Sequence, residues 1–240
     1  MKVFHKATAV AVASLFALSA NAAVVTKFGD DVSFTFDDAT LYGDGLVVGN
    51  SIFFQPTEFR AESLNGEGAV TASETLNITV TATTSTYKIT DAIFAETGDY
   101  YLSGGDASVT ASGRLQLTSQ TTNCETPPPL PGFPAGNGPC TDAEIFNVGG
   151  LDTVGATTEW SGATEISLAD TLGWVEDTQM TMQLQNNLSA TTLANGEQAW
   201  IQKKLGGVGL TVVPVPAAVW LFGSALGALG WMRRRVTAVS

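Results

Sequence analysis

The stretch NITVTAT, residues 77–83, alternates apolar and hydroxylated side chains and decides the fold. A period of two residues is typical of a β-strand with one face in a core and the other in solvent. The same alternation recurs in the stretches VSFTF, SVTA, RLQL and MTMQLQ, at residues 32–36, 108–111, 114–117 and 180–185. No stretch keeps a helical apolar period beyond two turns.

Turn-forming residues separate these stretches. Short clusters of Gly, Asn and Asp lie at residues 43–45, 49–50, 65–66, 98–99, 104–106, 149–150, 195–196 and 206–207. Many short alternating strands with turns between them are typical of antiparallel β-sandwiches. We therefore predict an all-β chain: a single antiparallel, β-sandwich or jelly-roll-like domain over residues 23–213.

The charge of the chain is strongly acidic. It has 240 residues with 11 Lys and Arg against 23 Asp and Glu, a net charge of −12. Five of the cations lie in the terminal segments, which have no acid, so the body keeps 6 cations and a net charge of −17. Such a surface repels nucleic acid and anionic lipid, because both bind basic faces. We predict no nucleic-acid partner.

The only histidine, His5, lies near the N-terminus and outside the predicted body. Histidine is the commonest general base and metal ligand near neutral pH. A body without it has no Ser-His-Asp triad, no Cys-His dyad and no ordinary zinc site. We therefore predict that the protein is not an enzyme.

The chain has two cysteines, Cys124 and Cys140, on either side of the segment ETPPPLPGFPAGNGP. If the chain is exported, it meets an oxidising compartment, and we expect the two to form one disulfide. The segment between them is rich in Pro and Gly, so we expect a loop between two strands. The alternative is a redox or metal-binding pair, for which the sequence offers no neighbouring histidine.

The N-terminus has the three parts of a secretory signal peptide. Lys2 and Lys6 form a positive region, residues 7–18 are apolar, and Ala20-Asn21-Ala22 fits the small-residue rule for cleavage. We predict that residues 1–22 are removed by signal peptidase, so that the mature protein begins at Ala23. The apolar run is too short to cross a bilayer comfortably.

The C-terminus has an apolar segment of a second kind. Residues 217–232 contain no charge, and three arginines follow at once. Since cationic flanks stay in the cytoplasm, the segment would leave its C-terminus inside and the body outside. It is short against the ~20 residues of a membrane helix. We predict a membrane helix and arginine stop within residues 214–235, and a cytoplasmic tail at 236–240.

The order VPVPA at 213–217, then Trp220-Leu221, Gly223-Ser224, an apolar run and an arginine cluster resembles the PEP-CTERM sorting signal, in its V-P-x-P-A variant. The resemblance covers about the last 28 residues. It implies an exosortase that recognises and removes the tail, and an outer-surface or extracellular-matrix destination in a Gram-negative bacterium that makes exopolysaccharide. The residues that match the signal are Pro214, Val215, Pro216, Ala217, Arg233, Arg234 and Arg235.

Two further sets of residues in the body are candidates for binding. Asp37, Asp38 and Asp44 lie close in sequence and are weak candidates for calcium, against the alternative of solvated turns. No other cofactor is expected. The tryptophans of the body are core residues or, on an exposed sheet face, platforms for sugar rings; they are Trp160, Trp174 and Trp200.

Three functions compete for this pattern. The first is a non-catalytic surface or extracellular-matrix protein, sorted by exosortase and associated with exopolysaccharide or biofilm. The second is a carbohydrate-binding, lectin-like module, which predicts an exposed aromatic row beside a groove. The third is a secreted hydrolase with two carboxylates, which predicts a buried acid pair in a deep cleft.

Overall fold

A computed structural model describes residues 24–126, 136–171 and 173–214 of the protein. These residues form strands throughout, with one short 3-10 helix, η1 (Leu168–Asp170). The strands are β1 (Val24–Phe28), β2 (Val32–Asp37), β3 (Gly45–Val48), β4 (Ser51–Phe54), β5 (Arg60–Leu64), β6 (Gly68–Ala82), β7 (Tyr87–Ser103), β8 (Ser108–Thr126), β9 (Gly136–Asn147), β10 (Thr158–Ser167), β11 (Gln179–Thr192) and β12 (Gln198–Pro214).

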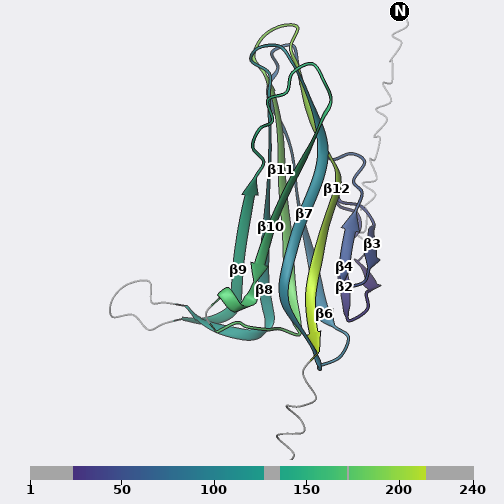
Figure 1. Ribbon diagram of the computed structural model, residues 1–240, viewed down its shortest axis with the longest axis vertical. Coiled ribbons are helices and arrows are strands. Elements are labelled where there is room, and N and C mark those ends of the chain that lie inside the picture. The colour runs from purple at the N-terminus through teal and green to yellow at the C-terminus, as the bar shows by residue number, and fades with distance from the viewer. Residues whose placement is uncertain (1–23, 127–135, 172, 215–240) are drawn as a thin grey trace, which may run out of the picture.

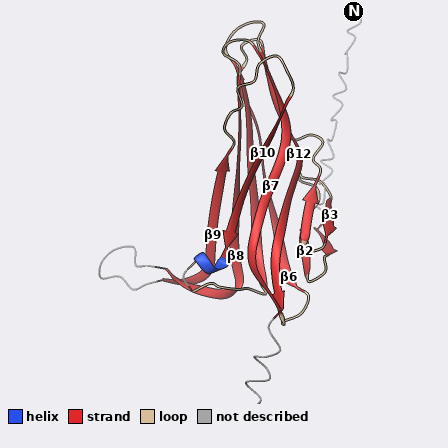
Figure 2. Ribbon diagram, in the orientation of Figure 1, coloured by secondary structure: helices blue, strands red, loops and turns tan. Residues whose placement is uncertain are grey.

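The strands form two antiparallel sheets that pack face to face as a sandwich (Figures 1 and 2). Sheet 1 has the order β1-β2-β6-β11-β8-β9. Sheet 2 has the order β10-β7-β12-β4-β3, with β5 also paired to β12. The predicted fold class, an all-β antiparallel sandwich, is confirmed.

The central strands run along the length of the molecule (Figure 1). The pairing of β7 with β12 extends from Tyr87 beside Pro214 to Ser103 beside Gln198. The end of β12 and the outward-reaching ends of β8 and β9 therefore lie at one end of the sandwich (lower in Figure 1), and the β11–β12 turn lies at the other.

The core lies between the two sheets, and the alternation in the sequence fills it. In β2, Val32, Phe34 and Phe36 are buried while the residues between them are partly exposed. Phe36 of sheet 1 meets Phe54 of sheet 2 edge to face, with ring centroids 5.5 Å apart. Full burial of each such side chain stabilises the fold by roughly 1.5–3 kcal/mol. This packing explains why the period-two stretches predict strands correctly.

Most predicted turns are confirmed, and two are wrong. The clusters at 49–50, 65–66, 104–106, 149–150 and 195–196 separate consecutive strands, and the cluster at 43–45 leads into β3, which begins at Gly45. The clusters at 98–99 and 206–207, by contrast, lie inside β7 and β12. Their glycines make room for neighbours: a Cβ at Gly98 would lie 2.7 Å from the indole nitrogen of Trp160, and one at Gly207 would lie 2.6 Å from the ring of Phe53.

The two predicted targeting segments lie almost wholly outside the described residues. The predicted signal peptide, 1–22, and all of the predicted tail beyond Pro214 belong to this part of the chain. β12 runs through Pro214, one residue past the predicted end of the body. Within residues 24–126, 136–171 and 173–214, no helix has the length and hydropathy to cross a membrane.

Candidate functional site

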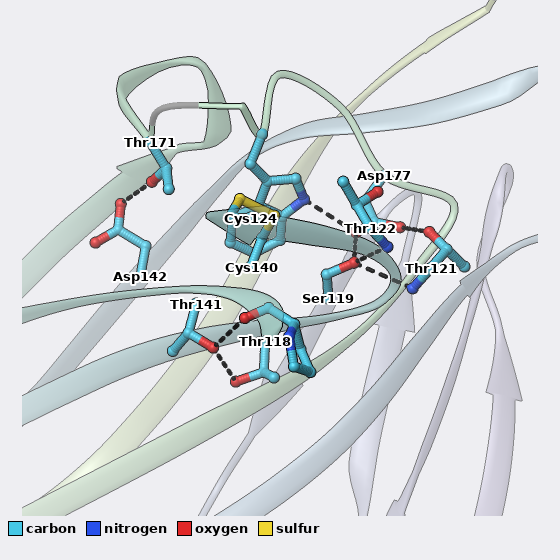
Figure 3. The surroundings of a disulfide bond; sticks show 12 residues. Thr118, Ser119, Thr121, Thr122, Cys124, Cys140, Thr141, Asp142, Thr171 and Asp177 are labelled. Atoms are coloured by element: carbon cyan, nitrogen blue, oxygen red, sulfur yellow. Dashed lines mark hydrogen bonds between the residues drawn. A yellow bond between two sulfur atoms is a disulfide. The ribbon is translucent and has the colours of Figure 1, made fainter. Parts of the chain in front are cut away.

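The disulfide predicted from the sequence is present. Cys124 of β8 and Cys140 of β9 are bonded, with an S–S distance of 1.98 Å and Cα atoms 4.8 Å apart (Figure 3). Pairing of β8 with β9 continues beyond it, with Glu125 opposite Asn137. The bond thus clamps the base of the loop between the two strands, as expected. A disulfide of this kind indicates an oxidising, extracytoplasmic compartment.

A buried carboxylate, that of Asp177, lies close to the disulfide (Figure 3). It accepts hydrogen bonds from the hydroxyls of Ser119 and Thr121 on β8 and from the indole of Trp174 at 3.0 Å. The backbone N–H groups of Thr178 and Gln179 also donate to it, at 2.7 and 3.1 Å. Every one of these donors belongs to the protein's own framework, so Asp177 fixes the segment before β11 onto β8.

A second contact holds the same end of the sandwich together. The hydroxyl of Thr171 donates to the carboxylate of Asp142 on β9 at 2.6 Å (Figure 3). The residue after η1 is thereby joined to β9, two residues beyond Cys140. We call the outward-reaching ends of β8 and β9 the projecting arm. The disulfide and the hydrogen bonds of Asp142 and Asp177 hold the base of this arm to the sandwich.

The core between the sheets contains a polar cluster that the sequence analysis missed. Lys203 of β12 forms an ion pair with Glu96 of β7, and both side chains are fully buried. The carboxamide of Asn186, on β11 of the other sheet, donates to the second oxygen of Glu96 at 2.9 Å and to the carbonyl of Ser112 at 3.1 Å. Glu96 thus contacts a lysine and an asparagine from opposite sheets.

Aromatic rings surround the amine of Lys203. Its Nζ lies 4.6 Å from the ring centre of Tyr42, 5.2 Å from that of Phe59 and 5.5 Å from that of Phe94. Burial lowers the pKa of Lys203 and raises the pKa of Glu96, although each partner's charge and hydrogen bonding opposes the shift. The uncharged amine and the protonated carboxyl are therefore favoured relative to water.

The predicted sorting residues are placed only at their first position. Pro214 is the last residue of β12 and lies opposite Tyr87. The remaining residues of the predicted motif lie outside the described residues: Val215, Pro216, Ala217, Arg233, Arg234 and Arg235.

The three aspartates proposed for calcium have separate environments. Asp37 accepts a hydrogen bond from the backbone N–H of Ala39 at 2.9 Å, and Asp44 forms an ion pair with Lys27. In the part of the chain that the structure describes, no group of three or more His, Cys, Asp or Glu side chains forms a metal-binding cluster. Calcium binding at Asp37, Asp38 and Asp44 stays a prediction.

Two of the three tryptophans are core residues, and the third lies on the outer face of sheet 2. Trp160 and Trp174 are buried, with exposed fractions of 4% and 0%. Trp200 is half-buried and stacks against Tyr101 of β7, with ring centroids 6.2 Å apart. The guanidinium of Arg60 on β5 lies 4.3 Å from the Trp200 ring centre. We call Trp200, Tyr101 and Arg60 the aromatic platform.

An apolar groove lies on the same outer face, farther along β12. Phe53, Ile93 and Leu205 line it, together with glycines of β12, and its volume is about 250 Å³. One residue in the sequence pointed to a binding surface on the outer face of sheet 2. This was Trp200, which lies at an outward position of an alternating strand. The pairing of Trp200 with Tyr101, a residue far from it in sequence, was not predictable from that signal.

Comparison with known proteins adds no further constraint. No protein-family model matches the chain, and a search of curated proteins finds no significant match.

Proposed function

We propose that this protein is a non-catalytic structural component of the bacterial surface or extracellular matrix, exported by a signal peptide and sorted through its C-terminal tail. The observation that carries the proposal is the Cys124–Cys140 disulfide in a sandwich whose sequence continues at both ends into targeting-type segments. Disulfides persist in oxidising compartments, which the chain reaches only if it is exported.

The contacts of the buried carboxylates support a non-catalytic role for the protein. Among the described residues these are Glu96, Asp99, Asp177 and Glu197. Glu96 and Asp99 pair with lysines, and Asp177 and Glu197 accept several hydrogen bonds from the protein itself. The partners of these acids all belong to the protein itself, whereas a glycosidase needs a pair that faces its substrate.

The sorting step follows from the order of segments in the chain. β12 ends at Pro214, so the V-P-x-P-A stretch begins where the folded sandwich stops. Proline disfavours helical backbone for the residue before it, and an extended backbone is the form that a processing enzyme such as an exosortase would need. Signal peptidase and exosortase are thus the expected processing partners. The membrane is a transient partner through the apolar tail, and exopolysaccharide is the expected neighbour of the mature body.

The test compares the native chain with Pro214→Ala/Pro216→Ala in a host with exosortase. The native chain should be found at the surface or in the medium at the mass of the processed protein. The double variant should stay in the membrane fraction as a heavier precursor. Equal processing and equal location of the two would contradict the sorting proposal.

A second candidate function, carbohydrate binding, is favoured by the aromatic platform and the groove beyond it. An aromatic ring at the surface offers an apolar face and a polar edge, on which a sugar ring can stack. A glycan array probed with the exported full-length protein tests this function, with and without calcium. Binding that is lost in Trp200→Ala but kept in Phe28→Ala, an exposed aromatic of β1, would establish it. Absence of binding on the array would contradict it.

A further inference from the structure

Two reactive side chains meet at a single carboxyl group in the core. One oxygen of Glu96 contacts the amine of Lys203, and the other accepts the hydrogen bond from Asn186 at 2.9 Å. The amine and the carboxamide are therefore neighbours around one acid. They come from different sheets, since Lys203 lies on β12 and Asn186 on β11.

The cluster contributes little to the stability of the fold. Burying a lysine and a glutamate costs desolvation energy that their attraction barely offsets, and apolar residues of similar size often serve stability as well. The carboxamide oxygen of Asn186 also has no hydrogen-bond partner among the described residues. Buried polar groups without partners are rare and call for an explanation.

Glycines of the paired strands lie beside both groups. Gly113 lies opposite Asn186 in the β8–β11 pairing, and a Cβ there would be 2.9 Å from the Asn186 nitrogen. Gly206 lies opposite Glu96 in the β7–β12 pairing, and a Cβ there would be 3.5 Å from the Lys203 amine. A side chain at residue 113 would collide with the Phe146 ring, at 2.4 Å, as well as with the Asn186 carboxamide. A Cβ at residue 206 would meet the Lys203 amine at an ordinary van der Waals distance.

We propose that Lys203 and Asn186 become joined by an amide bond between their side chains, formed by the protein itself with Glu96 as the catalytic residue. The inference is independent of the proposed function. Burial among aromatic rings favours the uncharged form of the Lys203 amine, and the uncharged amine is the form that acts as a nucleophile. The reaction is acyl transfer from one nitrogen to another, and it needs no cofactor and no oxidant.

The atoms balance as follows. The lone pair of Lys203 Nζ attacks Cγ of Asn186 and forms a new C–N bond. The Glu96 oxygen facing Lys203 accepts a proton from Nζ, and the oxygen facing Asn186 donates a proton to the departing nitrogen. The original C–N bond of Asn186 breaks, and ammonia leaves. Glu96 ends in the protonated state in which it began.

The product would tie β11 of sheet 1 to β12 of sheet 2 across the core. Like a disulfide, such a link lowers the entropy of the unfolded chain. Unlike the Cys124–Cys140 bond, it would survive reducing agents. The two links would fasten different regions of the sandwich, the projecting arm and the middle of the core.

Peptide mapping of the exported full-length protein tests the proposal. After denaturation and reduction, cleavage on the C-terminal side of Glu and Lys releases residues 177–197 and 198–203 separately from an unlinked chain. In a linked chain the modified Lys203 is no longer cleaved, so cleavage moves to Lys204. The product is one branched species of 177–197 with 198–204, lighter by one ammonia than the sum of free 177–197 and free 198–204.

Glu96→Gln should abolish the branched species and restore the two separate peptides, since the amide cannot relay the proton. Glu62→Gln, a partly exposed glutamate of β5 in the same sheet, is the control and should keep the link. Unlinked peptides from the folded native protein would overturn the proposal, even if Glu96→Gln fails to fold. Loss of ammonia within an unbranched 177–197 peptide, as in a cyclic imide of asparagine, would also count against it.

Discussion

The indole of Trp160 on β10 occupies the place where a side chain of residue 98 on β7 would lie. Gly98 is opposite Trp160 in the strand pairing, and the indole nitrogen donates to the carbonyl of Gln202 at 3.1 Å. A Cβ at Gly98 would be 1.9 Å from that carbonyl oxygen and 2.7 Å from the indole nitrogen. Because one of these obstacles is backbone, the clash cannot be relieved by a side-chain rotation.

Gly98→Ala should therefore lower the free energy of unfolding by about 1–3 kcal/mol, the usual cost of overpacking. Gly105→Ala is the matched control, because a Cβ there meets no atom within 4 Å. Its effect should stay within about 0.5 kcal/mol. Denaturant unfolding followed by tryptophan fluorescence measures both. Equal stability of the two variants would show that the Trp160 contact is not as tight as described.

This contact also shows where sequence reasoning succeeds and fails. Alternation alone places β2, because its partners need only bury one face of Val32, Phe34 and Phe36. Gly98-Asp99 has the composition of a turn, and only the distant Trp160 explains why a glycine belongs inside a strand there. The same holds for Gly207, where a Cβ would lie 2.6 Å from the ring of Phe53.

Of the candidate sites, one was predictable from the sequence and another was not. The disulfide was predictable, since the chain has two cysteines and an export-type N-terminus. The Lys203–Glu96–Asn186 cluster was not, because 90 residues separate Glu96 from Asn186. One sequence feature did point to a buried charge. Lys203 continues the alternation of Ala199 and Ile201, which are the inward-facing residues of β12.

Asp177→Ala should be strongly destabilising. The change would leave the hydroxyls of Ser119 and Thr121 and the indole of Trp174 without their acceptor. Removing one partner of several buried hydrogen bonds costs on the order of 3 kcal/mol. Asp152→Ala, at an exposed loop position, is the control and should change little. Thermal unfolding compares the two, and a small effect at Asp177 would argue against its role in fixing this end of the sandwich.

Glu197 should make stability depend on pH. Its carboxylate accepts hydrogen bonds from the backbone N–H groups of Asp106, Leu193 and Ala194, at 2.8, 2.9 and 2.9 Å, and these lower its pKa. A lowered pKa in the folded state adds stability above the unfolded value, about 4.3, and that stability is lost as pH falls through the folded value.

Glu197→Gln should accordingly be less stable than the native protein at neutral pH, with the difference shrinking as the solution becomes acidic. Urea unfolding at a series of pH values measures it. Glu67→Gln, an exposed glutamate in the neighbouring β5–β6 turn, is the control. A difference between native and Glu197→Gln that grows toward acid pH would contradict the assigned sign.

Reduction of Cys124–Cys140 should lower the free energy of unfolding by about 3 kcal/mol, the chain-entropy value for a loop of this length. The body should stay folded, because the strand pairs of both sheets and the apolar residues buried between them remain. Unfolding curves with and without reductant measure the change, and Cys124→Ser/Cys140→Ser should match the reduced protein. Curves that coincide with and without reductant would mean that the bond is absent from the exported protein.

The central claim, that the protein is exported and sorted by removal of its tail, is tested most directly by sequencing both ends of the native protein isolated from the cell surface. Mass spectrometry of its terminal peptides should find Ala23 at the N-terminus and a C-terminus upstream of Arg233. A surface protein that keeps Met1, or that still carries Arg233, Arg234 and Arg235, would contradict the account.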